Sequence, residues 1–158
     1  MRRFIASSLL SLAAVQLAPA TLSAQDREVP YWASLDAEEV NMRVGPSPRF
    51  PIEWVYRREG LPVKVVRTMQ GWRLVQDPQG EQGWIVARLL TRERHAIVIG
   101  EGLAQMRELP AEDSPLMWQV EPDVVGELGD CRENWCEFNV EGRAGWIASD
   151  RLWGPGEP

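Results

Sequence analysis

The 158-residue chain has a single histidine and two cysteines, which leaves little room for chemistry built on these side chains. His95 lies alone in a charged stretch, so a nucleophile triad has no convincing base. A structural zinc site needs one more ligand than the cysteine pair and His95 supply. Glycines stand singly at turns and form no phosphate-binding loop. We therefore expect no metal, no cofactor and no catalytic residue.

Positive charge is scarce as well. The chain has 17 Lys and Arg against 23 Asp and Glu, a net charge of −6. An acidic domain repels phosphate, so nucleic acid and anionic lipid surfaces are disfavoured as partners. The adjacent acids Glu38-Glu39 and Glu112-Asp113 have polar neighbours, which favours a solvated surface over a general acid/base pair.

No apolar run is long enough for a membrane span, which takes about 20 residues. The best candidate, residues 4–17, follows two arginines and precedes three spaced alanines, the layout of a secretory signal peptide. We predict a signal peptide over residues 1–24, with cleavage after Ala24 and no stable membrane insertion afterwards. Ala18-Pro19-Ala20 is a second candidate cleavage site. Cleavage would leave 15 basic and 23 acidic residues, a net charge of −8. The expected location is periplasmic or secreted.

The chain does contain an internal repeat. The segment 42–54 recurs as 106–118, with Met-Arg, two prolines and Trp in matching places at an offset of 64 (106 − 42). The Gly-Trp-Ile of residues 83–85 recurs at 145–147, an offset of 62 (145 − 83). Two copies are too few for a solenoid or a propeller. The repeat predicts two small modules in tandem.

The residues between these anchors have the alternation of β-strands. Leu61, Val63 and Val65 alternate with polar or exposed positions, and the turn residues of 77–80 follow the next strand. Each copy closes with a short segment, 87–90 or 149–152, that fits a 3₁₀ turn. Four or five short strands cannot bury both faces of an open sheet, which favours a small barrel.

The connection between the copies is short and charged. Residues 91–95 lack apolar periodicity, and the strand-like run 96–99 could begin the second module or pair with the first. Because no long spacer separates the copies, we expect a fixed relative orientation.

These motifs resemble the bacterial SH3-like (SH3b) domain. The likeness rests on Asn41-Met42-Arg43, on Gly45-Pro46-Ser47 and on the late Gly83-Trp84-Ile85, and it covers about residues 36–153. It implies an all-β chain of two small SH3-like β-barrels in tandem, with domain 1 over 36–91 and domain 2 over 96–153.

The second copy departs from this pattern. Glu108-Leu109 stands where the first copy has Val44-Gly45, and no Asn precedes Met106. This departure argues against a binding surface shared by both copies. It does not change the predicted fold.

The resemblance implies binding rather than catalysis. Such domains are found in cell-envelope proteins, so we expect a non-catalytic exported binding module that contacts peptidoglycan or an envelope protein. The alternative is a structural or accessory protein–protein interaction subunit with no cell-wall ligand. Proline-rich peptide recognition of the eukaryotic SH3 kind needs a cluster of tyrosines, and the chain has only Tyr31 and Tyr56.

The eight tryptophans allow two interpretations. They can fill the cores of modules too small to be stable otherwise, or some can form an exposed platform for sugars or peptides. The ligand-binding candidates are Trp54, Tyr56, Trp72, Trp84 and Arg43. Arg43 and its repeat partner Arg107 also fit a structural role, each pairing with a loop carbonyl.

Four residues separate Cys131 from Cys136 and include a polar turn between two extended runs. A hairpin there brings the two Cβ atoms within disulfide reach, and an exported protein meets an oxidising compartment. The spacing is not that of a C-x-x-C redox pair. We predict a structural disulfide.

Overall fold

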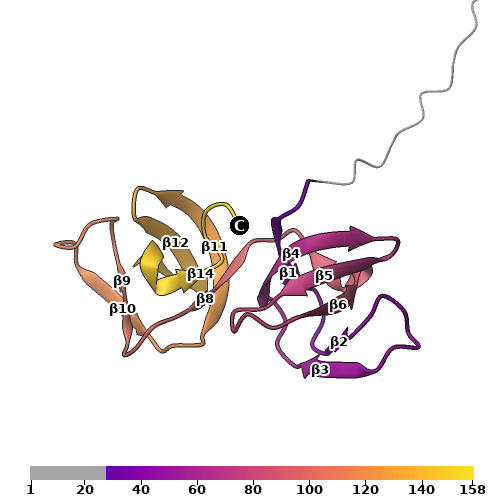
Figure 1. Cartoon of the computed structure of the whole chain (residues 1–158). Coiled ribbons are helices and arrows are strands. Elements are labelled where there is room, and N and C mark those ends of the chain that lie inside the picture. Colours follow the sequence, from indigo (N-terminus) through magenta and orange to yellow (C-terminus); the bar gives the residue numbers. More distant parts are fainter. Residues whose placement is uncertain (1–27) are drawn as a thin grey trace, which may run out of the picture.

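The computed structural model describes residues 28–158, which form two antiparallel β-sheets side by side (Figure 1). The first sheet contains β1 (Tyr31–Leu35), β2 (Val40–Arg43), β3 (Ile52–Tyr56), β4 (Pro62–Met69), β5 (Trp72–Gln76), β6 (Gln82–Val86) and β7 (Leu90–Thr91). The second contains β8 (His95–Val98), β9 (Ala104–Arg107), β10 (Leu116–Val120), β11 (Val125–Arg132), β12 (Trp135–Val140), β13 (Arg143–Ala148) and β14 (Leu152–Trp153). The predicted signal peptide lies outside the described residues.

The two sheets have the same topology. The strand order is β3-β2-β6-β5-β4-β1-β7 in the first and β10-β9-β13-β12-β11-β8-β14 in the second, which is the same order shifted by seven strands. A short 3₁₀ helix precedes the last strand of each, η1 (Ala87–Leu89) and η2 (Ser149–Arg151), as the sequence predicts. The repeat in sequence is therefore a repeat in structure, and the all-β expectation is confirmed.

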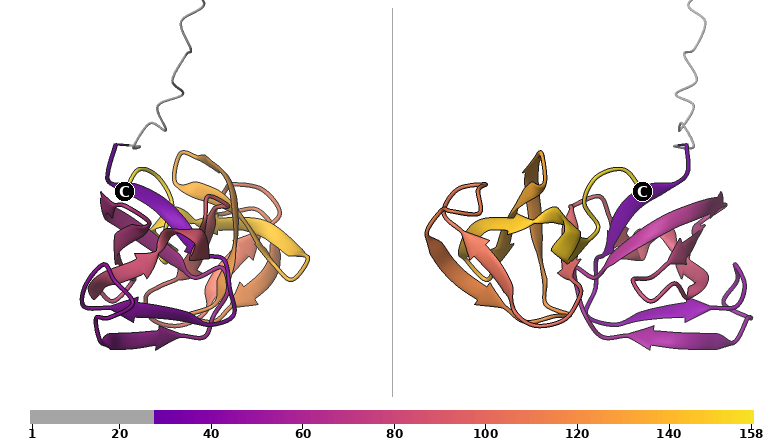
Figure 2. Two further views of the ribbon diagram at one scale, coloured as in Figure 1. Left: turned by 90° about the vertical axis from the view of Figure 1, so that its right-hand side faces the viewer. Right: turned by 60° about the vertical axis from the view of Figure 1, so that its left-hand side comes forward.

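Each sheet curls around its own core. Val63, Val65, Val75 and Ile85 are fully buried in the first, where alternation along each strand points every second side chain inward. Leu128, Phe138 and Ile147 take the places of Val65, Val75 and Ile85 in the second. Figure 2 shows the two curled sheets as separate lobes.

The Cys131–Cys136 disulfide is present, as predicted. The two residues pair directly across β11 and β12, with Cα atoms 4.0 Å apart. The strands extend farther than the sequence suggested, so that only Glu133 and Asn134 form the turn. Glu133 has a positive φ of 54°, the left-handed conformation that a tight hairpin turn requires. The bond closes one end of the second sheet.

Strand β8 links the two lobes and contributes to both cores. It pairs with β11 and β14 of the second sheet. Ala96 and Val98 point into the second core, whereas Ile97 between them belongs to the first. Because successive side chains of a strand point to opposite faces, a single strand can serve two cores. The run 96–99 thus starts the second module and also packs on the first.

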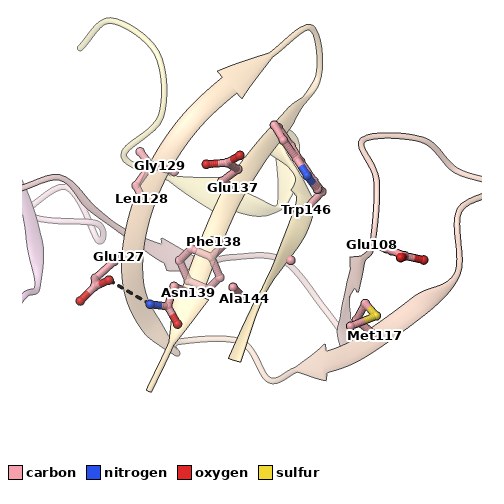
Figure 3. A pocket seen from close by; sticks show the side chains of 11 residues that line it. Glu108, Met117, Glu127, Leu128, Gly129, Glu137, Phe138, Asn139, Ala144 and Trp146 are labelled. Carbon is pink, nitrogen blue, oxygen red and sulfur yellow. Dashed lines mark hydrogen bonds between the residues drawn. The ribbon is translucent and has the colours of Figure 1, made fainter. Parts of the chain in front are cut away.

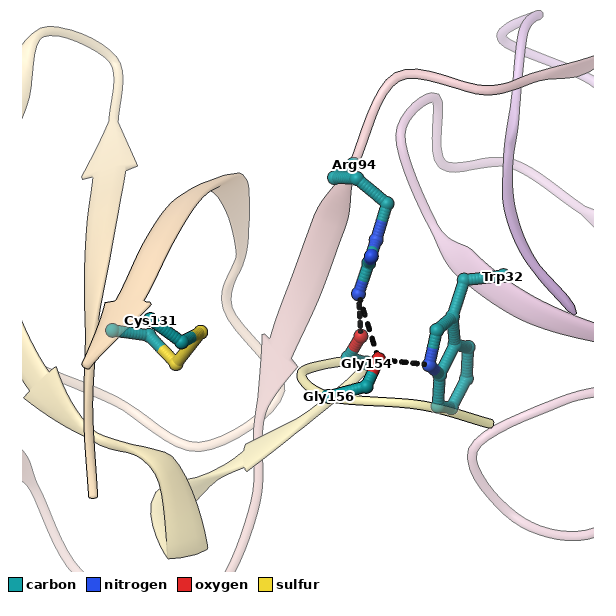
Figure 4. The surroundings of a disulfide bond; sticks show 6 residues. Trp32, Arg94, Cys131, Gly154 and Gly156 are labelled. Atoms are coloured by element: carbon teal, nitrogen blue, oxygen red, sulfur yellow. Dashed lines mark hydrogen bonds between the residues drawn. A yellow bond between two sulfur atoms is a disulfide. The ribbon is translucent and has the colours of Figure 1, made fainter. Parts of the chain in front are cut away.

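The C-terminal segment makes further contacts between the lobes (Figure 4). The indole Nε1 of Trp32 donates to the carbonyl oxygen of Gly156 at 3.1 Å, and Arg94 Nη2 donates to that of Gly154 at 2.6 Å. Trp32 and Trp153 also meet edge to face, with centroids 4.6 Å apart. These contacts agree with the expected fixed orientation.

Strand β1 was not predicted. Four of its five residues are buried, because it lies between β4 and β7 within the sheet and also faces the second lobe. It therefore lacks the polar alternation by which a half-exposed strand is recognised. The first sheet consequently begins at Tyr31, ahead of the segment that resembles the SH3-like domain.

Candidate functional site

The main concave surface of the first lobe lies beside the β2–β3 hairpin and holds about 750 Å³. We call it the Trp54 groove. Strand β3, the β5–β6 turn and two residues of the second lobe, Ile97 and Asp123, line the groove. The side chains that define it are Met42, Glu53, Trp54, Tyr56, Arg58, Asp77, Glu81, Ile97 and Asp123.

Trp54 is the exposed aromatic of this groove. It lies in β3, which pairs only with β2 and forms one edge of the sheet. Its side chain is 59% exposed, although a ring of this size gains much free energy from burial. The ring of Tyr56 lies 6.5 Å away, tilted by 55°. An exposed tryptophan over a hollow is a surface on which a ligand can stack.

Tyr56 and Asp77 form the fixed base of the groove. The Tyr56 hydroxyl donates to Asp77 Oδ2 at 2.8 Å, and both residues are buried. Asp77 Oδ1 accepts backbone N–H bonds from Gln79 and Glu81 at 3.0 and 2.9 Å, which orders the β5–β6 turn. Burial, with the Asp77 hydrogen bond as a further cause, raises the pKa of Tyr56. The phenol therefore stays protonated and acts as a permanent donor.

The groove also touches the second lobe. Arg58 Nη1 donates to the backbone oxygen of Asp123, and Ile97 of β8 lines the inner end. The junction between the lobes therefore forms one side of the groove, and the groove stays open.

The structure brings together only two of the five residues predicted from sequence, Trp54 and Tyr56. Trp72 is half-buried on β5 and does not line the groove. Trp84 is 8% exposed, so little of its ring can reach a ligand. Arg43 Nη1 donates to the carbonyl oxygen of Phe50 at 2.7 Å.

The loop-carbonyl role proposed for the repeated arginines is confirmed. Arg107 Nη1 donates to the carbonyl oxygen of Ser114 at 2.6 Å, as Arg43 does to Phe50 in the first copy. Each arginine thus ties down the loop that joins the two strands of its hairpin.

Sequence reasoning missed the role of Asp77, which it treated only as a turn residue. An aspartate at the start of an Asp-Pro-Gln-Gly turn predicts that its side chain accepts a hydrogen bond from the backbone N–H two residues later. Nothing in the sequence links this aspartate to Tyr56. Ile97 and Asp123 were also missed, because their part depends on how the two lobes pack.

His95 has a structural position. Its Nδ1 lies 3.2 Å from Ser34 Oγ, and Ser34 is buried and donates its hydroxyl to the carbonyl oxygen of Glu93 at 2.9 Å. The Ser34 hydroxyl donates its proton to the Glu93 carbonyl oxygen and not to His95, so Ser34 and His95 are not arranged as a nucleophile and its base. Residues 28–158 contain no cluster of metal-binding side chains and no helix long and apolar enough to cross a bilayer.

Comparison with known families agrees with this architecture. Residues 36–91 and 100–154 each match the family model described as "Bacterial SH3 domain". The strand repeat and the family match coincide, so each lobe is an SH3-like barrel and the predicted tandem is confirmed.

Individual proteins are more distant. The Bacillus subtilis (strain 168) protein named "Putative N-acetylmuramoyl-L-alanine amidase YrvJ" is 22% identical over 128 residues, which are 75% of this chain and 24% of that protein. The chain thus spans about a quarter of that relative's length.

Two solved structures are similar to this chain at a low level. NlpC2 from Trichomonas vaginalis is 14% identical with a TM-score of 0.37, over 82% of this chain and 50% of that one. An NlpC/P60 family protein from Bacillus cereus ATCC 10987 is 13% identical with a TM-score of 0.35, over 80% of this chain and 57% of that one. Likenesses this remote carry no argument about activity.

Proposed function

This chain belongs to the bacterial SH3 domain family, and on that premise we propose that it is a non-catalytic binding module of the bacterial cell envelope. The ligand is a peptide of the cell wall or of an envelope protein, held in the Trp54 groove. The observation that carries the proposal is the exposed Trp54 ring above a base fixed by the Tyr56–Asp77 hydrogen bond.

Two further points support a cell-wall ligand. The curated relative has a name that refers to a bond of peptidoglycan, and the matching segment is only part of its length. The predicted signal peptide would deliver the protein to the periplasm or outside the cell, where the wall lies. We thus propose a periplasmic or secreted location and a role in binding without catalysis.

The groove suits a peptide that is stacked rather than deeply enclosed. Trp54 offers one face for a sugar or an apolar side chain, and Glu53, Arg58 and Glu81 at the margin offer charged partners. A preformed base that needs no rearrangement lowers the entropic cost of binding.

Sedimentation with isolated cell-wall sacculi tests this proposal. The purified protein should sediment with the sacculi, and Trp54→Ala should reduce its retention about 10-fold, as for an aromatic at the centre of an interface. Trp118→Ala is the matched control, because Trp118 takes the same position in the second copy without lining the groove. It should retain binding.

Other outcomes would contradict parts of the proposal. Equal loss in both variants would mean that the Trp54 groove is not the specific site. No retention of the unmodified protein, together with co-purification of one envelope protein, would favour the accessory role without a cell-wall ligand.

A further inference from the structure

The second lobe has a hollow of its own. It lies on the outer face of β11, β12 and β13, opposite the β9–β10 hairpin, and holds about 540 Å³. Figure 3 shows Glu127, Asn139 and Glu137 on the β11–β12 side, with Glu108 and Met117 across from them. We call it the acidic hollow. We propose that it binds a basic peptide segment of a partner protein through a lysine or arginine side chain.

The two copies differ in charge and side-chain size at this face. Equivalent positions follow from the strand registers, in which Glu137 pairs with Trp146 as Leu74 pairs with Trp84. The residues of the acidic hollow that differ in kind are Glu108, Met117, Glu127, Gly129, Glu137 and Ala144. Their counterparts in the first copy are Val44, Glu53, Lys64, Val66, Leu74 and Gln82. Three of these positions have a carboxylate only in the second copy, one has it only in the first, and two have a smaller side chain in the second copy.

The small residues open the space. A Cβ at Gly129 would lie 2.9 Å from both Cβ and Oε2 of Glu137, so any side chain there would collide with the carboxylate. Ala144 has a smaller side chain than Gln82, the residue at the equivalent position of the first copy. The change is therefore one of shape as well as charge.

The carboxylates are available to a ligand. Glu108 and Glu137 have no ion-pair partner within residues 28–158, and Glu127 accepts only the Asn139 side-chain amide, at 3.0 Å. That bond holds the Glu127 carboxylate at the rim. The other polar atom of the amide, Asn139 Oδ1, is buried without a hydrogen-bond partner in the described part of the chain. An incoming N–H donor has several acceptors here.

Apolar and aromatic groups complete a site for a long cationic side chain. Met117 is exposed at the rim, and Trp146 and Phe138 form the inner wall. The guanidinium of Arg132 lies over the Trp146 ring, 5.3 Å from its centroid, so this ring already accepts a cation on one face. A lysine or arginine could pack its methylene stem on Met117 while its head group meets the carboxylates.

The charge of the whole lobe favours the same partner. Residues 36–91 have eight Lys and Arg against seven Asp and Glu, a net charge of +1. Residues 100–154 have four against twelve, a net charge of −8. The excess of negative over positive charge therefore belongs to the lobe with the acidic hollow, and the field of this lobe attracts cations toward it.

Calorimetric titration with a short peptide containing one lysine tests the inference. The peptide should bind, the same peptide with its lysine Nε-acetylated should not, and affinity should fall as sodium chloride is raised. Glu137→Gln keeps the shape but removes one carboxylate, and it should weaken binding about 10-fold. Glu101→Gln is the matched control, because it removes the same charge from an exposed loop of the same lobe and should leave binding unchanged.

Ala144→Gln separates shape from charge. It restores the residue of the first copy and fills the hollow without altering a carboxylate, so it should also weaken binding. Equal binding of the acetylated peptide would overturn the inference. So would an equal effect of Glu101→Gln and Glu137→Gln, which would mean attraction to the lobe as a whole and no site. Circular dichroism of each variant verifies the fold.

Discussion

Tyr56 and Asp77 are the residues on which the shape of the Trp54 groove depends. Their hydrogen bond is buried, and Asp77 also holds the β5–β6 turn through two backbone bonds. A buried acceptor that loses its donor has no water to replace it, so its desolvation is not compensated. The groove should therefore be sensitive to the loss of one hydroxyl.

Tyr56→Phe removes that hydroxyl and little else. We expect the free energy of unfolding to fall by about 1–3 kcal/mol, because Asp77 Oδ2 is left unpaired. Urea denaturation measures the change. Glu39→Gln, which breaks the exposed Glu39–Arg57 ion pair, is the control and should cost less than about 1 kcal/mol. A similar loss in both variants would contradict the role given to the buried bond.

The same variant should change the response to alkali. The folded state raises the pKa of Tyr56, mainly by burial. Its contribution to stability is thus complete below the usual tyrosine pKa of about 10 and declines above it, because the unfolded chain releases the proton first. Unfolding free energies at several pH values above about 10 should fall less steeply for Tyr56→Phe than for the unmodified protein. Parallel curves would contradict this.

At the scale of the strands, the sequence predicts most of what the structure contains. The repeated Gly-Trp-Ile segments, the 3₁₀ turns and the cysteine hairpin depend on local periodicity and turn chemistry, and all are found. Strand β1 was missed because it is buried on both faces. Local pattern also could not distinguish the exposed Trp54 from the buried Trp84, since exposure depends on which strand lies at the sheet edge.

The disulfide should stabilise one hairpin only. It closes a small loop, for which chain entropy predicts about 2 kcal/mol. Reduction, or Cys131→Ser with Cys136→Ser, should lower the free energy of unfolding by that amount in urea titrations. The rate of amide hydrogen exchange should increase in β11 and β12. It should stay unchanged around Trp54, which lies in the other lobe. Faster exchange throughout the first lobe would show that the bond acts more widely than its position implies.

At the scale of the whole molecule, β8 makes the two lobes depend on each other. Ile97 fills the first core from a strand that is hydrogen-bonded into the second sheet, and its neighbour Val98 fills the second core. The sequence does not predict this arrangement in full, because the continuous apolar run 96–99 is consistent with burial of both faces of a strand but does not show that the two faces lie in different domains.

Ile97→Ala and Val98→Ala form a matched pair that tests this sharing. Each removes buried side-chain volume from the same strand, and each should cost about 1–4 kcal/mol. Ile97→Ala should increase hydrogen exchange in the core strands of the first lobe, β4 and β5. Val98→Ala should have its main effect on β11 and β12. If both variants affected the second lobe alone, β8 would not be a shared strand.

Stacking of an envelope ligand on Trp54 can be followed by nuclear magnetic resonance with indole-labelled protein. The Nε1–H signals of the eight tryptophans can be assigned one by one through Trp→Phe variants. On addition of soluble cell-wall peptides, we expect the Trp54 signal to shift and broaden while that of the buried Trp84 stays in place. A Trp54 signal that does not move while the protein is retained on sacculi would contradict it.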